Sequence, residues 1–514
     1  MLLILLSAFS IKAQQSKSVE TEKAIPDFAS ALQFLASPLL EGRETGSQGG
    51  YIAAEYIASQ FQSMHLQPYL SIHKPQDTRL SDYFQPFELL KVYTNHSSIS
   101  LQSIKNKGIK IILAEGTDFV TENTNETLLF TSEVVLAGYG IKLPELGYDN
   151  YQGLDVKNKV VLLFDGYPEQ QNFPGNTFQK FRTLVLNDEY DLGTKCREAA
   201  RQGAVAVIVT DPLTFAVYKP KNTFTNEQED IYTDATYLFP TQKLQSGIPC
   251  FRLTTAGSRK LSGISEFEFT SAREVITPGG VVSALQLTSN IDLKSATDTL
   301  KVYNVIGMIP GRDSLKTIVI GAHYDHLGKR GKDIYYGSDD NASGVAGLLA
   351  LARLWTENHT IPPCNIVFAS WTAEEKGLIG SEYYAGQLKH PEQIQLYINM
   401  DMISRSVKED STGRQLSIGT RTADEYLRNT ANSCNSSLSN PFTLDLWDVT
   451  GHSGSDYASF TAKNIPVMTY NTGLHDDYHT PRDVSAAADL VKMGDVLWLV
   501  NCSIEEVLEF VSNK

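Results

Sequence analysis

Two short segments of the sequence combine histidine and carboxylate side chains in a pattern that predicts a metal site. His323 and Asp325 follow the apolar, β-branched run 317–322, which is typical of a buried strand. Residues two apart in an extended chain face the same side, so one can bind a metal while the other acts at the same cavity. The carboxylate pair 339–340 precedes the apolar run 345–355, which is predicted to form a buried helix.

Each later strand predicted in this part of the chain is also followed by side chains that can bind a metal. They are Glu374 and Glu375 after 365–371, Asp401 after 395–400, and His479 after 466–470. In open α/β sheets, ligands collect outside the carboxyl ends of the strands. Any one of these residues alone would mean little, but their joint occurrence at strand ends indicates a single site.

The elements that must position these side chains alternate between strands and helices. Strands are predicted at 302–309, 317–322, 365–371, 395–400 and 466–470, and helices at 343–357, 376–388, 421–436 and 483–510. This alternation predicts an α/β fold, with a mixed, mostly parallel sheet flanked by helices on both faces.

The length of the chain and its local texture predict more than one domain. A chain of 514 residues is too long for one ordinary core. Residues 14–124 are expected to form an N-terminal segment that packs on the C-terminal domain, residues 271–514. Between them, residues 125–270 contain short predicted strands and no cluster of histidines and carboxylates, which favours a separate β-rich domain without catalytic residues.

Composition and the first residues restrict the partners and the location. Hydrophobic residues make up 42% of the chain, as in folded globular proteins, and the net charge of −15 disfavours nucleic acid as a partner. No run of about 18 apolar residues predicts insertion into a membrane. The apolar segment 1–13 is typical of a secretory signal cleaved after Ala13, so we expect a secreted or periplasmic protein.

The cysteines do not form a recognisable framework. The five cysteines are scattered, without Cys-x-x-Cys spacing. In an exported protein, Cys434 and Cys502 could form a disulfide, but the sequence leaves this pairing open.

Five motifs in the C-terminal domain resemble those of the M28 family of secreted two-zinc peptidases, typically aminopeptidases. They are Gly-Ala-His-Tyr-Asp-His (321–326), Gly-Ser-Asp-Asp-Asn-Ala-Ser-Gly (337–344), Thr-Ala-Glu-Glu-Lys-Gly (372–377), Asn-Met-Asp-Met (399–402) and Tyr-His-Thr-Pro (478–481). The resemblance covers the chain from about residue 300 and implies the zinc-peptidase, phosphorylase/hydrolase-like fold. The middle segment resembles a protease-associated (PA) domain inserted in such enzymes, and residues 35–43 resemble the N-terminal segment of bacterial members with that insertion.

The resemblance also implies a role for each predicted site residue. The roles are His323 and Asp401 as ligands of one zinc ion, Glu375 and His479 as ligands of a second, Asp340 as the bridge between the two ions, Glu374 as general base, and Asp325 as the acceptor of a hydrogen bond that orients His323. The family places a cis peptide bond directly after the bridging aspartate.

The residue types agree with these roles. Two histidines and three carboxylates suit zinc, which takes nitrogen and oxygen ligands at about 2.0–2.2 Å. Two ions about 3.5–4 Å apart can clamp one water molecule and polarise a carbonyl group. A neighbouring carboxylate, Glu374, can take the proton of that water and pass it to the leaving amine.

We therefore predict a two-zinc exopeptidase acting on peptides, and we favour an aminopeptidase. A carboxypeptidase of the same fold would need a cationic pocket, which Arg405, Arg414 or Arg421 could supply. A glutaminyl cyclase of this fold would use a single zinc with a reduced ligand set, and a non-catalytic peptidase-like binding protein would lack activity. The sequence leaves the oligomeric state open.

Other residues near these motifs are expected to have supporting roles. His326, His452 and His475 are predicted to orient ligands or to pack, because direct ligation by each is less common than packing. The segment 451–455 nearly matches the nucleophile elbow of serine hydrolases, but its fifth residue is Ser455 and no strand is predicted before it. A serine hydrolase is therefore disfavoured.

Overall fold

A computed structural model describes residues 28–69, 79–122, 127–146, 148–168, 191–211, 235–242, 248–264, 282–449 and 454–512. The predicted signal segment 1–13 and His452 lie outside these residues. In the described parts of the chain, no helix has the length and apolar character needed to cross a membrane.

The chain divides into two compact units. The first unit comprises Met1–Glu88 and Lys301–Lys514, and the second comprises Leu89–Leu300. This second unit includes more of the sequence than the insert expected at 125–270. Strands β2 (Phe84–Ser103) and β12 (Val282–Ile309) each begin in one unit and end in the other. The interpretation of the insert as a PA domain stays a prediction.

The first unit is built on a mixed α/β sheet, which confirms the predicted fold class. Its strands are β1 (Gln67–Pro68), β12, β13 (Asp313–His323), β16 (Cys364–Trp371), β17 (Ile394–Met400), β18 (Gln415–Thr420), β19 (Thr443–Asp448) and β20 (Val467–Asn471). The order across the sheet is β19-β18-β20-β17-β13-β16-β12, with β1 also paired to β12. The central strands β16, β13, β17 and β20 run parallel, whereas β12 and β18 are antiparallel to their neighbours in this central group.

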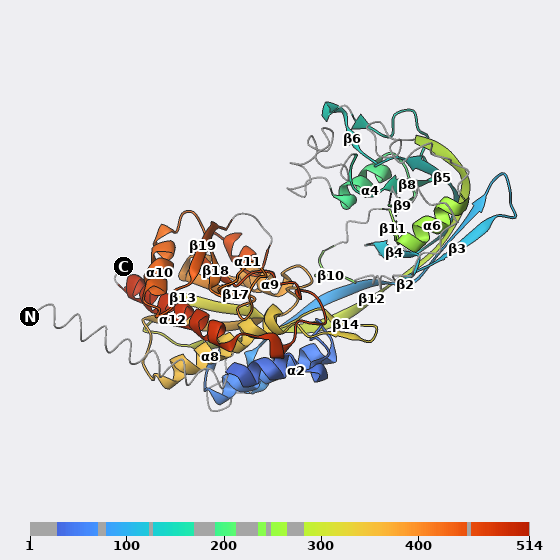
Figure 1. The fold of residues 1–514 in the computed structure, drawn as a ribbon. Helices are drawn as coiled ribbons and strands as arrows, with labels where there is room; N and C mark the ends of the chain where they lie inside the picture. The colour runs from blue at the N-terminus through green and yellow to red at the C-terminus, as the bar shows by residue number, and fades with distance from the viewer. Residues whose placement is uncertain are drawn as a thin grey trace, which may run out of the picture. The chain divides into compact units, whose positions relative to one another are not determined.

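Helices cover both faces of this sheet (Figure 1). On one face lie α2 (Gln48–Ser63), α8 (Gly344–Glu357), α10 (Glu425–Ser436) and α12 (Leu490–Ser512); on the other lie α9 (Ile379–Gln387) and α11 (Tyr457–Thr461). Strand β13 shows the alternation that produces two faces. Ile318 and Ile320 pack into the core beneath α2 and α8, whereas Val319 packs into the core beneath α9 and α11.

Two strands at one side of the sheet differ from the expectations. Strands β18 and β19 were not predicted, although alternating apolar and polar residues, as in the Thr-Leu-Asp-Leu-Trp-Asp of β19, are typical of a half-buried strand. The prediction that no strand precedes residues 451–455 is therefore wrong.

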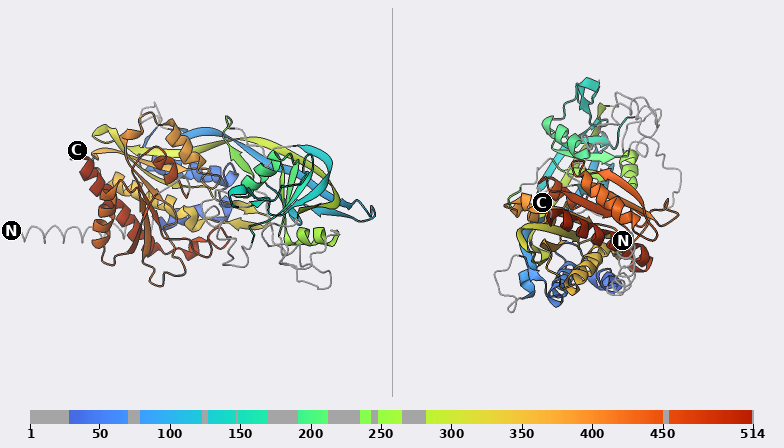
Figure 2. Two further views of the ribbon diagram at one scale, coloured as in Figure 1. Left: turned by 90° about the horizontal axis from the view of Figure 1, so that it is seen from above. Right: turned by 90° about the vertical axis from the view of Figure 1, so that its left-hand side faces the viewer.

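The strands of the second unit belong to the same hydrogen-bonded sheet, which continues through β12. Strands β5 (Leu128–Ala137), β8 (Val160–Phe164), β9 (Ala206–Thr210), β11 (Cys250–Leu253) and β4 (Phe119–Glu122) follow one another, and β12 pairs with β5. Helices α4 (Leu192–Arg201) and α6 (Thr255–Ile264), the strand β3 (Lys110–Ala114) paired with β2, and β10 (Thr236–Leu238) complete the second unit. Two separate apolar clusters form on the two faces of this sheet (Figure 2 shows further views of the ribbon).

The pairing of two cysteines is settled by the fold. Cys434 of α10 and Cys502 of α12 form a disulfide, with Cα atoms 5.9 Å apart. Cys196, Cys250 and Cys364 are buried and free. The pairing that the sequence left open therefore joins two helices on one face of the sheet in the first unit.

Candidate metal centre

The carboxyl ends of the parallel strands bring the predicted ligands to one place. Strand β13 ends at His323, β16 ends shortly before Glu374 and Glu375, β17 ends just before Asp401, and β20 leads into the loop that carries His479. The strand register sets these ends level, because His323 lies opposite Trp371 and Gly321 lies opposite Asn399. Asp340 comes from η5 (Ser338–Ser343), directly before α8.

The donor atoms form two groups. One group contains His326, Asp340, Glu375 and His479, and the other contains His323, Glu374 and Asp401; within each group the donor atoms lie within 4.8 Å of one another. All the predicted ligands are therefore brought together. The division into a His323–Asp401 group and a Glu375–His479 group is the one that the sequence resemblance implied.

Asp340 faces both groups. Its Oδ1 lies 3.4 Å from His323 Nε2, and its Oδ2 lies 3.0 Å from His479 Nε2. The carboxylate is buried, and the peptide bond that follows it is cis, as the resemblance implied. The two oxygens of this carboxylate therefore face different histidines, one in each donor group.

The spacing of the donor atoms fits zinc. A tetrahedral ion with ligands at about 2.0–2.1 Å has neighbouring ligand atoms about 3.3 Å apart. His323 Nε2 lies 3.4 Å from Asp401 Oδ1, and His479 Nε2 lies 3.3 Å from Glu375 Oε2. The mixture of imidazole nitrogens and carboxylate oxygens also suits zinc better than calcium or magnesium, which take oxygen ligands.

The Asp340 carboxylate is held in its ionised form. Burial opposes the ionisation of Asp340, but the surrounding histidines His326, His323 and His479 outweigh it and hold the pKa of this carboxyl well below its usual value. An ionised carboxylate is the form that binds a metal, so Asp340 is ready to act as a ligand at neutral pH.

Glu374 occupies a different environment from its neighbour Glu375. Its Oε2 lies 3.9 Å from His323 Nε2, beside Asp401. Burial raises the pKa of Glu374 well above its usual value; His323 opposes this shift, and the negative charges of Glu375, Asp456 and Asp401 add to it. A carboxyl that gains a proton easily suits a general base, which must hold the proton and then release it.

His326 is itself a member of one donor group, although the sequence predicted only an orienting or packing role. Its Nδ1 is 2.6 Å from Glu375 Oε1 and 3.6 Å from Asp340 Oδ2, and the residue is fully buried. The prediction of an orienting role fits the short hydrogen bond to Glu375, but the position also allows direct ligation. His475 lies outside both groups, with Nε2 3.4 Å from Asp339 Oδ2.

The predicted hydrogen bond from His323 to the Asp325 carboxylate is not formed. His323 Nδ1 lies 3.9 Å from Asp325 Oδ1 and 3.2 Å from the main-chain oxygen of Asp325. The carboxylate instead accepts hydrogen bonds from Thr45 Oγ1 at 2.8 Å and from the Glu374 amide at 3.1 Å. These two donors hold the carboxylate away from the imidazole, so Asp325 organises the site through Glu374 and through its own main chain.

Some residues of the site were not identified from the sequence. Ser455, considered above only as part of an elbow-like segment, donates from Oγ to Asp401 Oδ2 at 2.6 Å. Asp456 beside it is fully buried, and burial raises its pKa to about 7. Their only sequence signal is a short polar run before a helix, which is not specific. Thr45 lies 280 residues from Asp325 in the chain, so no local pattern could connect them.

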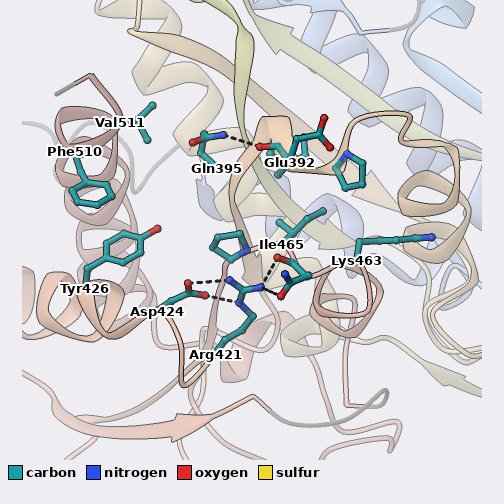
Figure 3. Close-up of a pocket in the computed structure, with 13 residues that line it drawn as sticks. Glu392, Gln395, Arg421, Asp424, Tyr426, Lys463, Ile465, Phe510 and Val511 are labelled. Atoms are coloured by element: carbon teal, nitrogen blue, oxygen red, sulfur yellow. Dashed lines mark hydrogen bonds and ion pairs between the residues drawn. The ribbon is translucent and has the colours of Figure 1, made fainter. Parts of the chain in front are cut away.

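Two cavities lie at opposite ends of the first unit's sheet. A small one of about 180 Å³ adjoins Asp401 and is lined on its other sides by Trp447 and Tyr457, among others. A larger one of about 430 Å³ opens at the amino ends of β17 and β20, far from the donor groups in the strand direction. Figure 3 shows this larger cavity, with the Arg421 guanidinium paired to Asp424.

The arginines considered for carboxylate binding have other partners. Arg405 pairs with Asp477 at 2.8 Å, and Arg414 pairs with Asp495 at 2.8 Å. Arg421 lies in the cavity at the amino ends of the strands. The structure therefore brings none of these three side chains into the donor groups.

Comparisons with known proteins agree with this geometry. Residues 304–501 match the family model of Peptidase family M28. A probable leucine aminopeptidase 2 of Aspergillus fumigatus is 28% identical over 199 residues, which are 38% of this chain and 38% of that protein. Leucine aminopeptidase 2 of Trichophyton rubrum is 33% identical over 128 residues, 24% of each chain. The matches thus span well under half of these curated relatives.

Solved structures share the fold over most of the chain. An aminopeptidase from Aneurinibacillus sp. strain AM-1 has a TM-score of 0.62 at 20% identity, covering 95% of both chains. A zinc aminopeptidase from Bacillus subtilis has a TM-score of 0.57 at 19% identity, covering 94% of this chain and 95% of that chain. The segment 304–501, which carries all the predicted ligands, is the part of the chain that matches the model of Peptidase family M28.

Proposed function

We propose that this protein is an aminopeptidase that binds two zinc ions and releases N-terminal residues from peptides. The observation that carries the proposal is the pair of donor groups that share Asp340, with one oxygen of that carboxylate facing each group. The names of the relatives, leucine aminopeptidase and zinc aminopeptidase, support the same activity and the same metal.

The residues divide the work of hydrolysis between them. His323 and Asp401 would hold one ion, Glu375 and His479 the other, and Asp340 both. When bound, zinc polarises the peptide carbonyl and lowers the pKa of a water molecule towards about 7. Glu374, whose pKa is raised by burial, takes a proton from the attacking water and gives it to the nitrogen of the leaving peptide.

The charge around the donor groups favours the amino end of the substrate. A free N-terminus is a cation, and the side chains that meet it here are carboxylates such as Glu374 and Asp401. A C-terminal carboxylate would need a cation, and the three candidate arginines are paired elsewhere. The carboxypeptidase alternative therefore has less support, and two complete donor groups disfavour a single-zinc glutaminyl cyclase and a non-catalytic protein.

We also propose export from the cytoplasm. The Cys434–Cys502 disulfide supports this, because structural disulfides persist in oxidising compartments. The predicted signal at residues 1–13 points in the same direction. N-terminal sequencing of the mature protein should begin at Gln14; retention of residues 1–13 would contradict this prediction.

The test of the proposed activity combines metal analysis with product analysis. Purified protein should contain zinc near two equivalents per chain and should hydrolyse aminoacyl-anilides. Mass analysis of a digested peptide library should show ladders shortened from the amino end; shortening from the carboxyl end would support the carboxypeptidase instead.

A single variant separates the role of Glu374 from that of the ligands. Glu374→Gln should reduce turnover by about 10²–10⁴-fold while leaving zinc bound, because the carboxylate is needed to carry the proton. Loss of zinc in Glu374→Gln would show that this residue is a ligand, as its place beside His323 and Asp401 allows.

A further inference from the structure

A turn near the N-terminus reaches the metal centre from outside the family-matched segment. This N-terminal turn, residues 41–47, connects η1 (Pro38–Leu40) to α2. Glu41, Gly42 and Arg43 have φ angles of 45°, 73° and 52°. Two of these residues are not glycine, and such a left-handed backbone persists only where the surrounding structure fixes it.

Arg43 ties several segments around the site together. Its side chain is fully buried, and its guanidinium donates to four main-chain carbonyls: Leu35, Tyr324 (2.8 Å), Tyr336 (2.8 Å) and Gly337 (2.8 Å). Tyr324 lies directly after the predicted ligand His323, and Gly337 begins the turn that leads to Asp340. The planar fork of arginine is suited to such a set of acceptors.

The positive charge of Arg43 interacts with the nearby carboxylates, but its guanidinium hydrogen bonds are made to the main chain. Burial lowers the pKa of Arg43 to about 10, and the carboxylates of Asp340, Asp483 and Asp325 oppose that shift, so the group is charged at neutral pH. The four hydrogen bonds of its guanidinium go to main-chain oxygens. The carboxylate oxygens therefore remain available to a metal.

Thr45 reaches the site by a second path. Its Oγ1 donates to Asp325 Oδ2 at 2.8 Å, and Asp325 Oδ1 accepts the amide of Glu374 at 3.1 Å. Both side chains of this first hydrogen bond are buried. The threonine hydroxyl thus fixes the carboxylate that holds the main chain of the proposed general base.

The main chain of the N-terminal turn also forms hydrogen bonds with the segment that follows His323. Arg43 O accepts the amide of His326 at 3.3 Å, and Gly42 O accepts the amide of Gly328 at 3.1 Å. A Cβ at position 42 would lie 2.2 Å from Tyr335 O, so only glycine allows this approach. The turn is therefore built closely against the segments that carry His323, His326 and Asp340.

We propose that Arg43 and Thr45 are positioning residues of the metal centre, which hold the segments 323–326 and 337–340 and the amide of Glu374 at the spacing that metal binding and proton transfer require. The proposal rests on the proposed function. It adds a requirement for a segment that precedes the matched region by about 260 residues.

The decisive variants change one hydroxyl while keeping the shape of the side chain. Thr45→Val removes the donor to Asp325, and Thr45→Ser retains it. Ser47→Ala is the matched control, because Ser47 lies in the same turn but caps α2 by accepting the Gly50 amide at 3.1 Å. Zinc affinity by chelator competition, kcat, KM and the thermal midpoint are measured for all three.

Thr45→Val should lower zinc affinity or kcat by about 10–100-fold, the usual effect of losing a partner that orients a metal site. KM should change little, and Thr45→Ser should restore wild-type behaviour. Ser47→Ala should lower the thermal midpoint without changing zinc affinity or kcat.

Arg43→Lys provides an independent test in case Thr45→Val does not fold. It keeps the positive charge, but one ammonium group cannot serve four carbonyls in the fixed geometry of the guanidinium. We expect the same 10–100-fold loss of zinc affinity or kcat.

Two results would overturn the positioning role: wild-type zinc affinity and kcat in folded Thr45→Val or Arg43→Lys, or equal losses in Ser47→Ala. A wild-type protein that binds no zinc would instead contradict the proposed function. The two failures are therefore distinguishable.

Discussion

The two ends of the parallel strands in the first unit differ in the ratio of acidic to basic side chains. At the carboxyl ends, the acidic side chains of Asp325, Asp340, Glu374, Glu375 and Asp401 gather with three histidines, and all of these residues are buried or half-buried. At the amino ends, the larger cavity is lined by Arg421 and Lys463 as well as Asp424 and Glu392. There the opposite charges are equal in number, and Arg421 pairs directly with Asp424.

The difference teaches how to recognise a site that requires a cation. Burying several carboxylates together is unfavourable unless a positive charge accompanies them. The amino ends supply their own counter-charges, whereas the carboxyl ends rely on histidines and the deeper Arg43. The size of a cavity is a poor guide here, since the larger cavity lies at the balanced end.

The largest effect is expected from neutralising the Asp340 carboxylate. Asp340→Asn should abolish detectable turnover and lower the zinc content, because the carboxylate faces both donor groups. Metal analysis and aminoacyl-anilide hydrolysis on the same preparation measure the result. Full zinc content in this variant would show that zinc binding at the carboxyl ends of the strands does not depend on the Asp340 carboxylate.

A buried pair that balances itself should contribute to stability and not to catalysis. The side chains of Asp410 and Lys492 are almost fully buried and 3.4 Å apart. Asp410→Asn should lower the free energy of unfolding by about 3–5 kcal/mol, because it leaves a buried ammonium group without its counter-charge. Urea unfolding at pH 7 measures the change, and zinc content should remain at the wild-type level.

The same pair predicts a pH dependence with a defined sign. Burial opposes the ionisation of Asp410, but hydrogen bonds from the Gln415 amide and Thr412, with the Lys492 ammonium, hold its pKa well below the usual value. The stability that Asp410 contributes is therefore present above its unfolded pKa of about 4 and is lost as pH falls towards the folded pKa. The difference between wild type and Asp410→Asn should narrow between pH 5 and pH 2; a constant difference would contradict the assignment.

Removal of the disulfide should have a smaller effect that is separate from the metal centre. Cys434 and Cys502 are 68 residues apart in the chain, and their bond restricts the unfolded chain. Cys434→Ser combined with Cys502→Ser should lower the free energy of unfolding by about 2–4 kcal/mol. A change in kcat at 25 °C would show coupling between α10, α12 and the donor groups that the contacts do not suggest.

The smallest effect is expected at the balanced end of the sheet. Glu392→Gln makes the same change of carboxylate to amide as Asp340→Asn, but on an exposed side chain of the larger cavity. Zinc content, turnover and the unfolding midpoint should all stay at wild-type values. A fall in turnover would mean that the two ends of the sheet are linked, and it would remove the contrast drawn between them.

The sequence determined the central strands and the residue types at their ends. Apolar, β-branched runs such as 317–322 form strands wherever they are buried, and a His or Glu that follows such a run must lie at the strand's end. Strands β18 and β19 were not predicted, although both alternate apolar with polar residues as half-buried strands do. Strand β12 crosses the division between the two units at residues 300 and 301, whereas the sequence placed the end of the insert at residue 270.

Only the tertiary structure decided which of these residues touch. The short bond between His326 and Glu375, the withdrawal of the Asp325 carboxylate from His323, and the approach of Arg43 and Thr45 depend on register, turn geometry and contacts across about 280 residues of chain. A local pattern reports which face a residue occupies, because backbone periodicity is local. Contacts between residues far apart in the sequence depend on how the segments pack, so only the tertiary structure shows them.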